Sequence, residues 1–172
     1  IEVKGSRNVT LEKIVVEQNG FRGIGVDIEG DPLDEEGSSH VLQNNNIRFY
    51  VEEGNALQLS ASKKNKIISN RIQQIGVRKN FGILLLNGSD QNYIMNNSII
   101  TGGIEGTALF VDQSHKNLFE NNLFVTGTPE DASASWHTPA LQLLNSLENY
   151  FQENTFISYG DETATISLFI PE

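Results

Sequence analysis

Two carboxylates spaced two residues apart, Asp27 and Glu29, are the first residues in this sequence whose type and spacing could do chemistry. In an extended strand their side chains point the same way, about 7 Å apart. Hydrolysis of a glycosidic bond needs two carboxyl groups roughly 5 to 10 Å apart, one acting as acid and the other as nucleophile or base. Asp27 and Glu29 are therefore a candidate catalytic pair, although many exposed strands carry such pairs.

A cluster of acidic residues follows in the segment DPLDEEGSS at 31–39. Carboxylate and backbone carbonyl oxygens are the ligands that Ca²⁺ prefers in proteins. A calcium site could form from Asp31, Asp34, Glu35 and Glu36. The segment lacks the glycine-anchored spacing of a calcium-binding loop, so an acidic loop exposed to solvent is the alternative. The sequence indicates no other cofactor, and three scattered histidines disfavour a multi-histidine metal site.

An internal repeat predicts the elements that position these side chains. Each copy has Asn, an apolar residue two positions on, a second Asn five on and an apolar residue seven on. The clearest copies are NKIISNRIQ (65–73), NYIMNNSII (92–100), NLFENNLFV (117–125) and NYFQENTFI (149–157). Two degenerate copies begin at Asn8 and His40, where we expect His40 to be structural. Further apolar alternations, such as ALQL at 56–59, give each unit three short strands.

Strands this short cannot bury an inner face alone, but stacked copies bury it together. Each strand would then pair in parallel with its copies about 4.8 Å above and below. A leucine-rich repeat has a similar period, but it needs a different leucine signature and a helical side. We therefore predict an all-β parallel solenoid of about six coils with three short sheets.

The N-x-I-x-x-N-x-I repeats resemble those of right-handed parallel β-helix proteins of the pectate-lyase-like superfamily. The resemblance implies a right-handed single-stranded β-helix, and it leaves function open because that fold carries lyases, hydrolases, epimerases, tailspikes and adhesins. It places the first sheet at 56–60, 83–87, 108–112 and 140–144, the second at 66–69, 93–96, 118–121 and 150–153, and the third at 71–75, 98–101, 123–126 and 155–158.

An asparagine ladder is expected at the corner between the second and third sheets. Its members would be Asn45, Asn70, Asn97, Asn122 and Asn154. Asparagine tolerates left-handed backbone angles, and its amide both donates and accepts hydrogen bonds between coils. Lys13 takes this position in the first copy, so the ladder should end there.

Polysaccharide-acting members of the superfamily generally use the outer surface of the first sheet. The alternation predicts these outward residues: Ala56, Gln58, Ser60, Ile83, Leu85, Asn87, Ala108, Phe110, Asp112, Ala140, Gln142 and Leu144. Among them Ile83, Leu85 and Phe110 would form an apolar patch, which usually marks a covered surface, a partner or a ligand platform. No Lys or Arg is among them, as a lyase base would require.

Two insertions, 31–39 and 128–139, border this surface, and the second carries the only tryptophan, Trp136, beside His137. Trp136 would either stack on a sugar or pack over Phe110 and Leu85 as a local core. The candidate ligand-binding residues are Gln58, Asn87, Phe110, Asp112, Trp136, His137 and Gln142.

The function classes that remain are a carbohydrate-active or carbohydrate-binding β-helix and a non-catalytic structural solenoid, such as a spacer, adhesin or tailspike section. If the protein is an enzyme, the fold suits a polysaccharide lyase, glycoside hydrolase or epimerase, but the superfamily's arginine-centred calcium site and Gly-His-Gly aspartate cluster are missing. A net charge of −10 disfavours nucleic acid as a partner.

The chain reads as one domain, 1–172, without a membrane-inserting segment or a signal peptide. Neither end shows a cap for the exposed strand edges. We expect a segment of a longer β-helix, or ends covered by a partner or a second copy. The resemblance alone implies a secreted or cell-surface protein.

Overall fold

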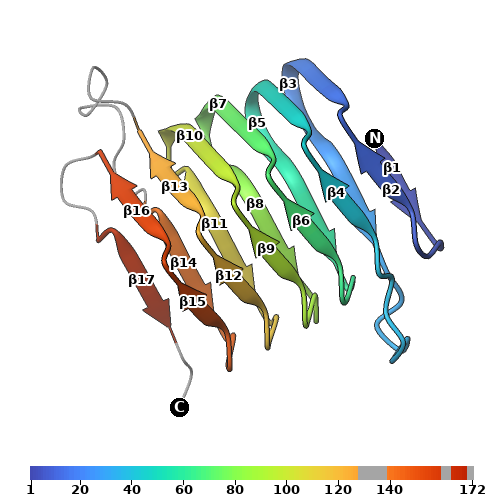
Figure 1. The fold of residues 1–172 in the computed structure, drawn as a ribbon. Coiled ribbons are helices and arrows are strands. Elements are labelled where there is room, and N and C mark those ends of the chain that lie inside the picture. Colours follow the sequence, from blue (N-terminus) through green and yellow to red (C-terminus); the bar gives the residue numbers. More distant parts are fainter. Residues whose placement is uncertain (128–138, 160–163, 170–172) are drawn as a thin grey trace.

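The chain coils into a parallel β-solenoid in the computed structural model, which describes residues 1–127, 139–159 and 164–169 (Figure 1). Successive coils stack in sequence order, and each described strand pair is parallel. The described residues contain strands and turns but no helix. The predicted all-β solenoid of about six coils is confirmed.

One face of every coil contributes a three-residue strand to a six-stranded sheet. Its strands are β2 (Thr10–Glu12), β4 (Val41–Gln43), β6 (Lys66–Ile68), β9 (Tyr93–Met95), β12 (Leu118–Glu120) and β15 (Tyr150–Gln152). We number the coils 1 to 6 by these strands. This is the second sheet expected from the sequence.

The other two predicted faces belong to one sheet of eleven described strands. The third face holds β7 (Arg71–Arg78), β10 (Ser98–Ile104), β13 (Leu123–Thr126) and β16 (Thr155–Ser158). The first face holds β1 (Glu2–Lys4), β8 (Asn80–Leu86), β11 (Thr107–Asp112), β14 (Leu141–Leu144) and β17 (Ile166–Phe169). The long strands β3 (Val15–Glu29) and β5 (Asn46–Ser60) run through both faces and join them.

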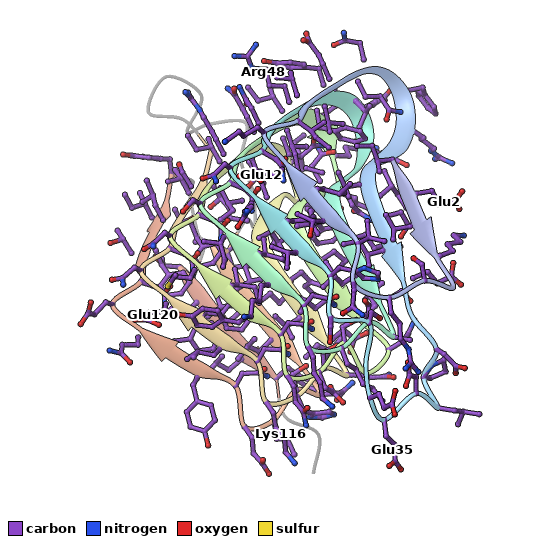
Figure 2. The ribbon with its side chains drawn as sticks, turned by 45° about the vertical axis from the view of Figure 1, so that its right-hand side comes forward. Glu2, Glu12, Glu35, Arg48, Lys116 and Glu120 are labelled. Carbon is purple, nitrogen blue, oxygen red and sulfur yellow. The ribbon has the colours of Figure 1, made fainter. Side chains whose placement is uncertain are left out.

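Inward side chains of all three faces form the core. On the second sheet the register aligns Leu42, Ile67, Ile94 and Phe119 from coil to coil, and all are at most 1% exposed. Phe119 stacks on Phe151 with ring centroids 4.7 Å apart. Charged side chains such as Glu2, Glu35 and Lys116 extend outward (Figure 2).

The asparagine ladder runs through the corner after the six-stranded sheet. The side-chain Oδ1 of each asparagine accepts a hydrogen bond from the backbone N–H of the preceding coil's asparagine. These bonds are Asn45 to Asn70 at 2.9 Å, Asn70 to Asn97 at 2.8 Å, Asn97 to Asn122 at 2.9 Å and Asn122 to Asn154 at 2.9 Å. All five predicted members are therefore in place.

Two details of this corner differ from the sequence prediction. The left-handed residue is the one before each ladder asparagine; for example, Asn96 has a φ of 56° and is exposed, whereas Asn97 is buried. In coil 1, Ile14 rather than Lys13 takes the ladder position, because its N–H donates to Asn45 Oδ1 (2.9 Å). Lys13 has the left-handed φ of 55° instead, so the ladder ends at coil 1 as predicted but with the register moved by one residue.

Two further columns stabilise the corner before the six-stranded sheet. Asn65, Asn92, Asn117 and Asn149 form a second amide ladder, and His40 begins it by donating its N–H to Asn65 Oδ1 (2.9 Å). Serine hydroxyls form another column, with bonds of 3.1 to 3.2 Å along Ser62, Ser89, Ser114 and Ser146. The serine column was missed, although a serine stands three residues before each of these asparagines.

Candidate functional site

The strand register defines the outer surface of the first sheet. One outward row, paired residue by residue, is Asp27, Gln58, Leu84, Phe110, Gln142 and Ser167. The next outward row is Glu29, Ser60, Leu86, Asp112, Leu144 and Phe169. Gln58, Phe110, Asp112 and Gln142, four of the predicted ligand-binding residues, lie in these rows with partly exposed side chains.

The sequence prediction was wrong about β8. Ile83 and Leu85 pair with Leu57 and Leu59, point into the core and are 0% exposed. In the segment ILLL (83–86) all four residues are apolar, so alternation alone could not decide which two face the core. Ala56, Ala108 and Ala140 were also wrongly expected to face outward, since all three are 0% exposed. A glycine takes their place in β8, where a Cβ on Gly82 would collide with Ile99 in the core.

An apolar patch does exist at the centre of this face, but its residues are Phe81, Leu84, Leu86 and Phe110. Leu84 is 5% exposed, and the other three are partly exposed. The rings of Phe81 and Phe110 lie 5.1 Å apart at an interplanar angle of 40°. Phe81 aligns with Asn55 and Thr107 in the neighbouring coils. We call these four residues the apolar patch.

Polar side chains flank the apolar patch along the sheet. Asn55 Nδ2 donates to Gln58 Oε1 (2.7 Å), and Gln58 Nε2 donates to Asp27 Oδ1 (3.3 Å). Gln142 lies on the opposite flank, beside Phe110. Asp112 has a buried Oδ1 atom with no hydrogen-bond partner in the described part of the chain.

Asn87 lies beyond the flat surface. It follows β8, adopts a left-handed φ of 55° and donates from Nδ2 to Ser60 Oγ (3.2 Å). The one-residue error in the β8 alternation placed it on the strand, whereas Leu86 pairs with Ser60. Asn87 therefore borders the face from the turn.

The candidate catalytic carboxylates both lie on the outer surface of β3, as expected, and both have partners. Asp27 accepts the bond from Gln58, and Glu29 forms an ion pair with Lys4 (2.7 Å). Lys4 also contacts Glu2 at 2.7 Å, and these two carboxylates raise the pKa of Lys4. A catalytic role for Asp27 and Glu29 stays a prediction.

Lys4 is a cation that the sequence prediction missed. The outward residues predicted from the sequence included no Lys or Arg, but Lys4 is the last residue of β1 and pairs in register with Glu29. The apolar run before it extended only to Val3, which gave no reason to continue the strand. Lys4 is the only Lys or Arg on the outward rows of the described first-sheet strands.

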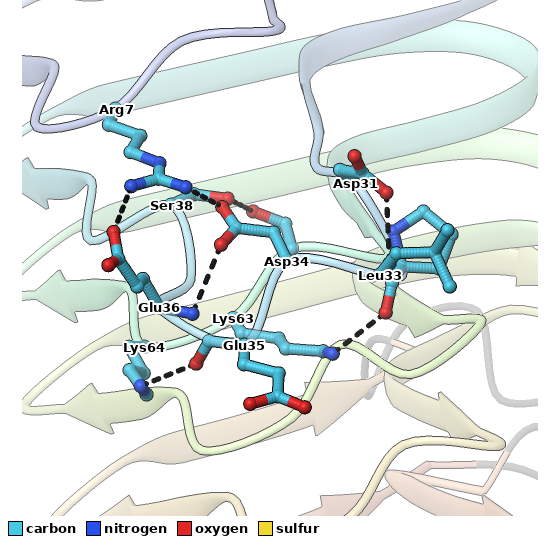
Figure 3. A network of polar contacts seen from close by, with 11 residues as sticks. Arg7, Asp31, Leu33, Asp34, Glu35, Glu36, Ser38, Lys63 and Lys64 are labelled. Carbon is cyan, nitrogen blue, oxygen red and sulfur yellow. Dashed lines mark hydrogen bonds and ion pairs between the residues drawn. The ribbon is translucent and has the colours of Figure 1, made fainter.

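The acidic loop at 31–37 is held by cations from the coils on either side (Figure 3). Arg7 of coil 1 forms ion pairs with Asp34 (2.8 Å) and with Glu36. Lys63 Nζ donates to the backbone carbonyl of Pro32 (3.0 Å), and Lys64 Nζ donates to that of Glu35 (2.8 Å). The loop is therefore tied to the coil on each side of it.

The carboxylates of this loop are already engaged. Desolvation alone would raise the pKa of Asp34, but Arg7 and the backbone N–H groups of Gly37 and Glu36 together lower it. Asp31 Oδ1 accepts the N–H of Leu33 (2.9 Å). Among the described residues no three His, Asp or Glu side chains gather as a metal site would require. Calcium binding by Asp31, Asp34, Glu35 and Glu36 stays a prediction, and a bound ion would have to compete with Arg7.

Replacing Arg7 with methionine is expected to loosen this loop while leaving the solenoid folded. The ion pairs are exposed, so their loss should barely move the midpoint of urea unfolding. Cleavage after Glu35 or Glu36 by a Glu-specific protease should become several-fold faster. Lys13→Met, which removes an exposed cation 3.6 Å from Glu12, is the control and should not change that rate. An unchanged cleavage rate in Arg7→Met would show that the lysine contacts alone fix the loop.

Trp136 and His137 lie outside the described residues, so their predicted stacking or packing roles stay predictions. Within the described ranges the chain has no helix that is long and apolar enough to span a membrane.

The family model for the right-handed β-helix region matches residues 1–156. The chain therefore belongs to the right-handed β-helix family. The match agrees with the predicted handedness and with the resemblance to pectate-lyase-like proteins. No curated protein matches the sequence.

Proposed function

We propose that the outer face of the first sheet binds a carbohydrate. The observation that carries the proposal is the row Gln58, Leu84, Phe110 and Gln142, in which amides flank an apolar and aromatic centre. Binding sites for small ligands are typically apolar with a few polar groups that fix orientation. A sugar ring has an apolar face and a rim of hydroxyls, so it matches both parts of this row.

The spacing of the row supports an extended ligand. Adjacent strands lie about 4.8 Å apart, so Gln58 and Gln142, three strands apart, are separated by about 14 Å. Phe110, with Phe81 beside it, would stack on a sugar ring. Gln58, Gln142 and the partly exposed carboxylate of Asp112 would bond hydroxyls. Asn87 would contact the ligand from the turn.

Charge favours a neutral glycan over a polyuronate. Lys4 is the one cation of the outward rows in the described strands, and Glu2 and Glu29 already engage it. The whole chain carries a net charge of −10, which opposes an anionic polymer. The family fits a protein that is secreted or displayed at a cell surface, where such glycans are met.

A non-catalytic structural solenoid is the second candidate. The observation in its favour is the apolar patch itself, which would serve packing against a second chain equally well. Solution mass separates the two candidates, because a stable trimer that buries the partly exposed Leu86 and Phe110 would support the structural class. A monomer with an accessible patch would support ligand binding.

The direct test is calorimetric titration with a panel of neutral and uronic-acid oligosaccharides. Phe110→Ala should weaken binding of the preferred glycan about tenfold, as expected for a central aromatic contact. Gln58→Ala and Gln142→Ala should each weaken it by less. The matched controls lie on the outer face of the six-stranded sheet: Tyr150→Ala, which removes an exposed aromatic, and Gln152→Ala, which removes an exposed amide. Equal losses in the controls, or no binding to any member of the panel, would overturn the proposal.

A further inference from the structure

Two imidazoles accept backbone hydrogen bonds from neighbouring coils. His40 Nδ1 in coil 2 accepts the N–H of Val9 in coil 1 (3.1 Å). His115 Nδ1 in coil 5 accepts the N–H of Leu147 in coil 6 (3.0 Å). At the other positions of the amide ladder that begins at His40, an asparagine Oδ1 accepts the backbone N–H of the neighbouring coil. For example, Asn92 accepts the N–H of Asn65 (2.9 Å). Unlike a carboxamide, an imidazole titrates between pH 5 and 8.

An imidazole nitrogen accepts a hydrogen bond only while it carries a lone pair. The bond from Val9 therefore requires a neutral His40 ring with the proton on Nε2. Protonation places a second proton on Nδ1, so that two donors face each other and the inter-coil bond is lost. We propose that His40 is a pH-sensitive clasp, which holds coil 1 to coil 2 when neutral and loosens it in acid.

His40 is buried, at 1% exposure. Its column neighbours, Val9 and Asn65, carry no charge, and Nε2 has no partner within the described structure. An imidazolium here would thus gain no compensating acceptor. The charged groups of the same corner point to the surface loop or to solvent: Arg7, Asp34, Glu36, Lys63, Lys64 and Lys66.

Burial lowers the pKa of His40. The unfolded chain therefore binds more protons than the folded one at mildly acidic pH, and stability rises with pH. The contribution of His40 is complete above the ordinary histidine pKa of about 6.5. It is lost progressively as the pH falls below that value toward the lowered pKa of the folded state.

Amide hydrogen exchange of the intact chain tests the clasp residue by residue. Protection factors, corrected for intrinsic exchange rates, would be compared at about pH 7.5 and about pH 5. Relative to Asn70 and Asn97, whose N–H groups bond to asparagine oxygens, Val9 protection should fall about tenfold in acid. In His40→Asn, Val9 protection should no longer depend on pH.

Two results would overturn the clasp. One is a parallel change of Val9, Asn70 and Asn97 with pH in the parent protein. The other is an acid-induced fall at Val9 that persists in His40→Asn. If His40→Asn does not fold, the nitrogen chemical shifts of His40 in the parent protein decide, because a proton on Nδ1 at neutral pH would rule out the bond from Val9.

Discussion

Replacing Asn97 with alanine is expected to lower the free energy of unfolding by about 4 kcal/mol, because each buried polar group left without a partner costs about 1–3 kcal/mol. Asn97 Oδ1 accepts the backbone N–H of Asn70 (2.8 Å), and Nδ2 donates to the carbonyl of Ile67 (2.8 Å). Both partners would be orphaned inside the corner. Equilibrium unfolding in urea measures the loss.

Asn96→Ala is the matched control, since it alters the adjacent asparagine of the same turn. Asn96 is exposed, and its φ of 56° makes alanine unfavourable by about 1 kcal/mol. Similar losses in the two variants would mean that the ladder bonds add little to stability. A loss confined to Asn97→Ala would assign the stability of this corner to the inward amide.

Replacing Leu85 with asparagine should cost about 5 kcal/mol, the sum of lost apolar burial and of a buried amide without partners. Leu85 pairs with Leu59 and is 0% exposed. The same substitution at Leu86, one residue later and on the outward row, should change stability by less than about 1 kcal/mol. Thermal or urea unfolding of the pair compares them directly. A larger loss of stability in Leu86→Asn than in Leu85→Asn would mean that Leu86 faces the core. That result would contradict the register of β8.

The sequence predicted the coil architecture well because the same pattern recurs in several units. Asn70, Asn97 and Asn122 stand at one position of the repeat, and no single strand would have shown that they stack. The prediction failed where the repeat is degenerate. Coil 1 has Ile14 at the ladder position, so aligning its copy on Asn8 shifted the register by one residue.

The candidate site was harder to predict because it depends on which face of a strand is outward. Gln58, Phe110 and Gln142 were placed correctly, since the residues on either side of each are apolar and go inward. ILLL gave no such contrast, and its phase is set by pairing with β5. Lys4 was missed because β1 can be recognised as a strand only from its pairing with β3.

The hydrogen-bonded columns and turn geometry of the corners could be predicted only in part from the sequence. The amide ladder follows from asparagine recurrence, but the left-handed residues before it vary in type, from Ser69 to Asn96 to Glu153. Backbone geometry at these turns is imposed by the stacked coils, which compensate for residues that alone disfavour positive φ. Local propensity could not have located them.

Chemical-shift mapping during titration with neutral oligosaccharides tests most directly whether the first-sheet face is the binding surface. We expect shifts concentrated at Gln58, Leu84, Phe110 and Gln142, with small changes at Tyr93 and Tyr150 on the six-stranded sheet. Shifts centred on Tyr93 and Tyr150, or none with any oligosaccharide, would rule out carbohydrate binding by the first-sheet face.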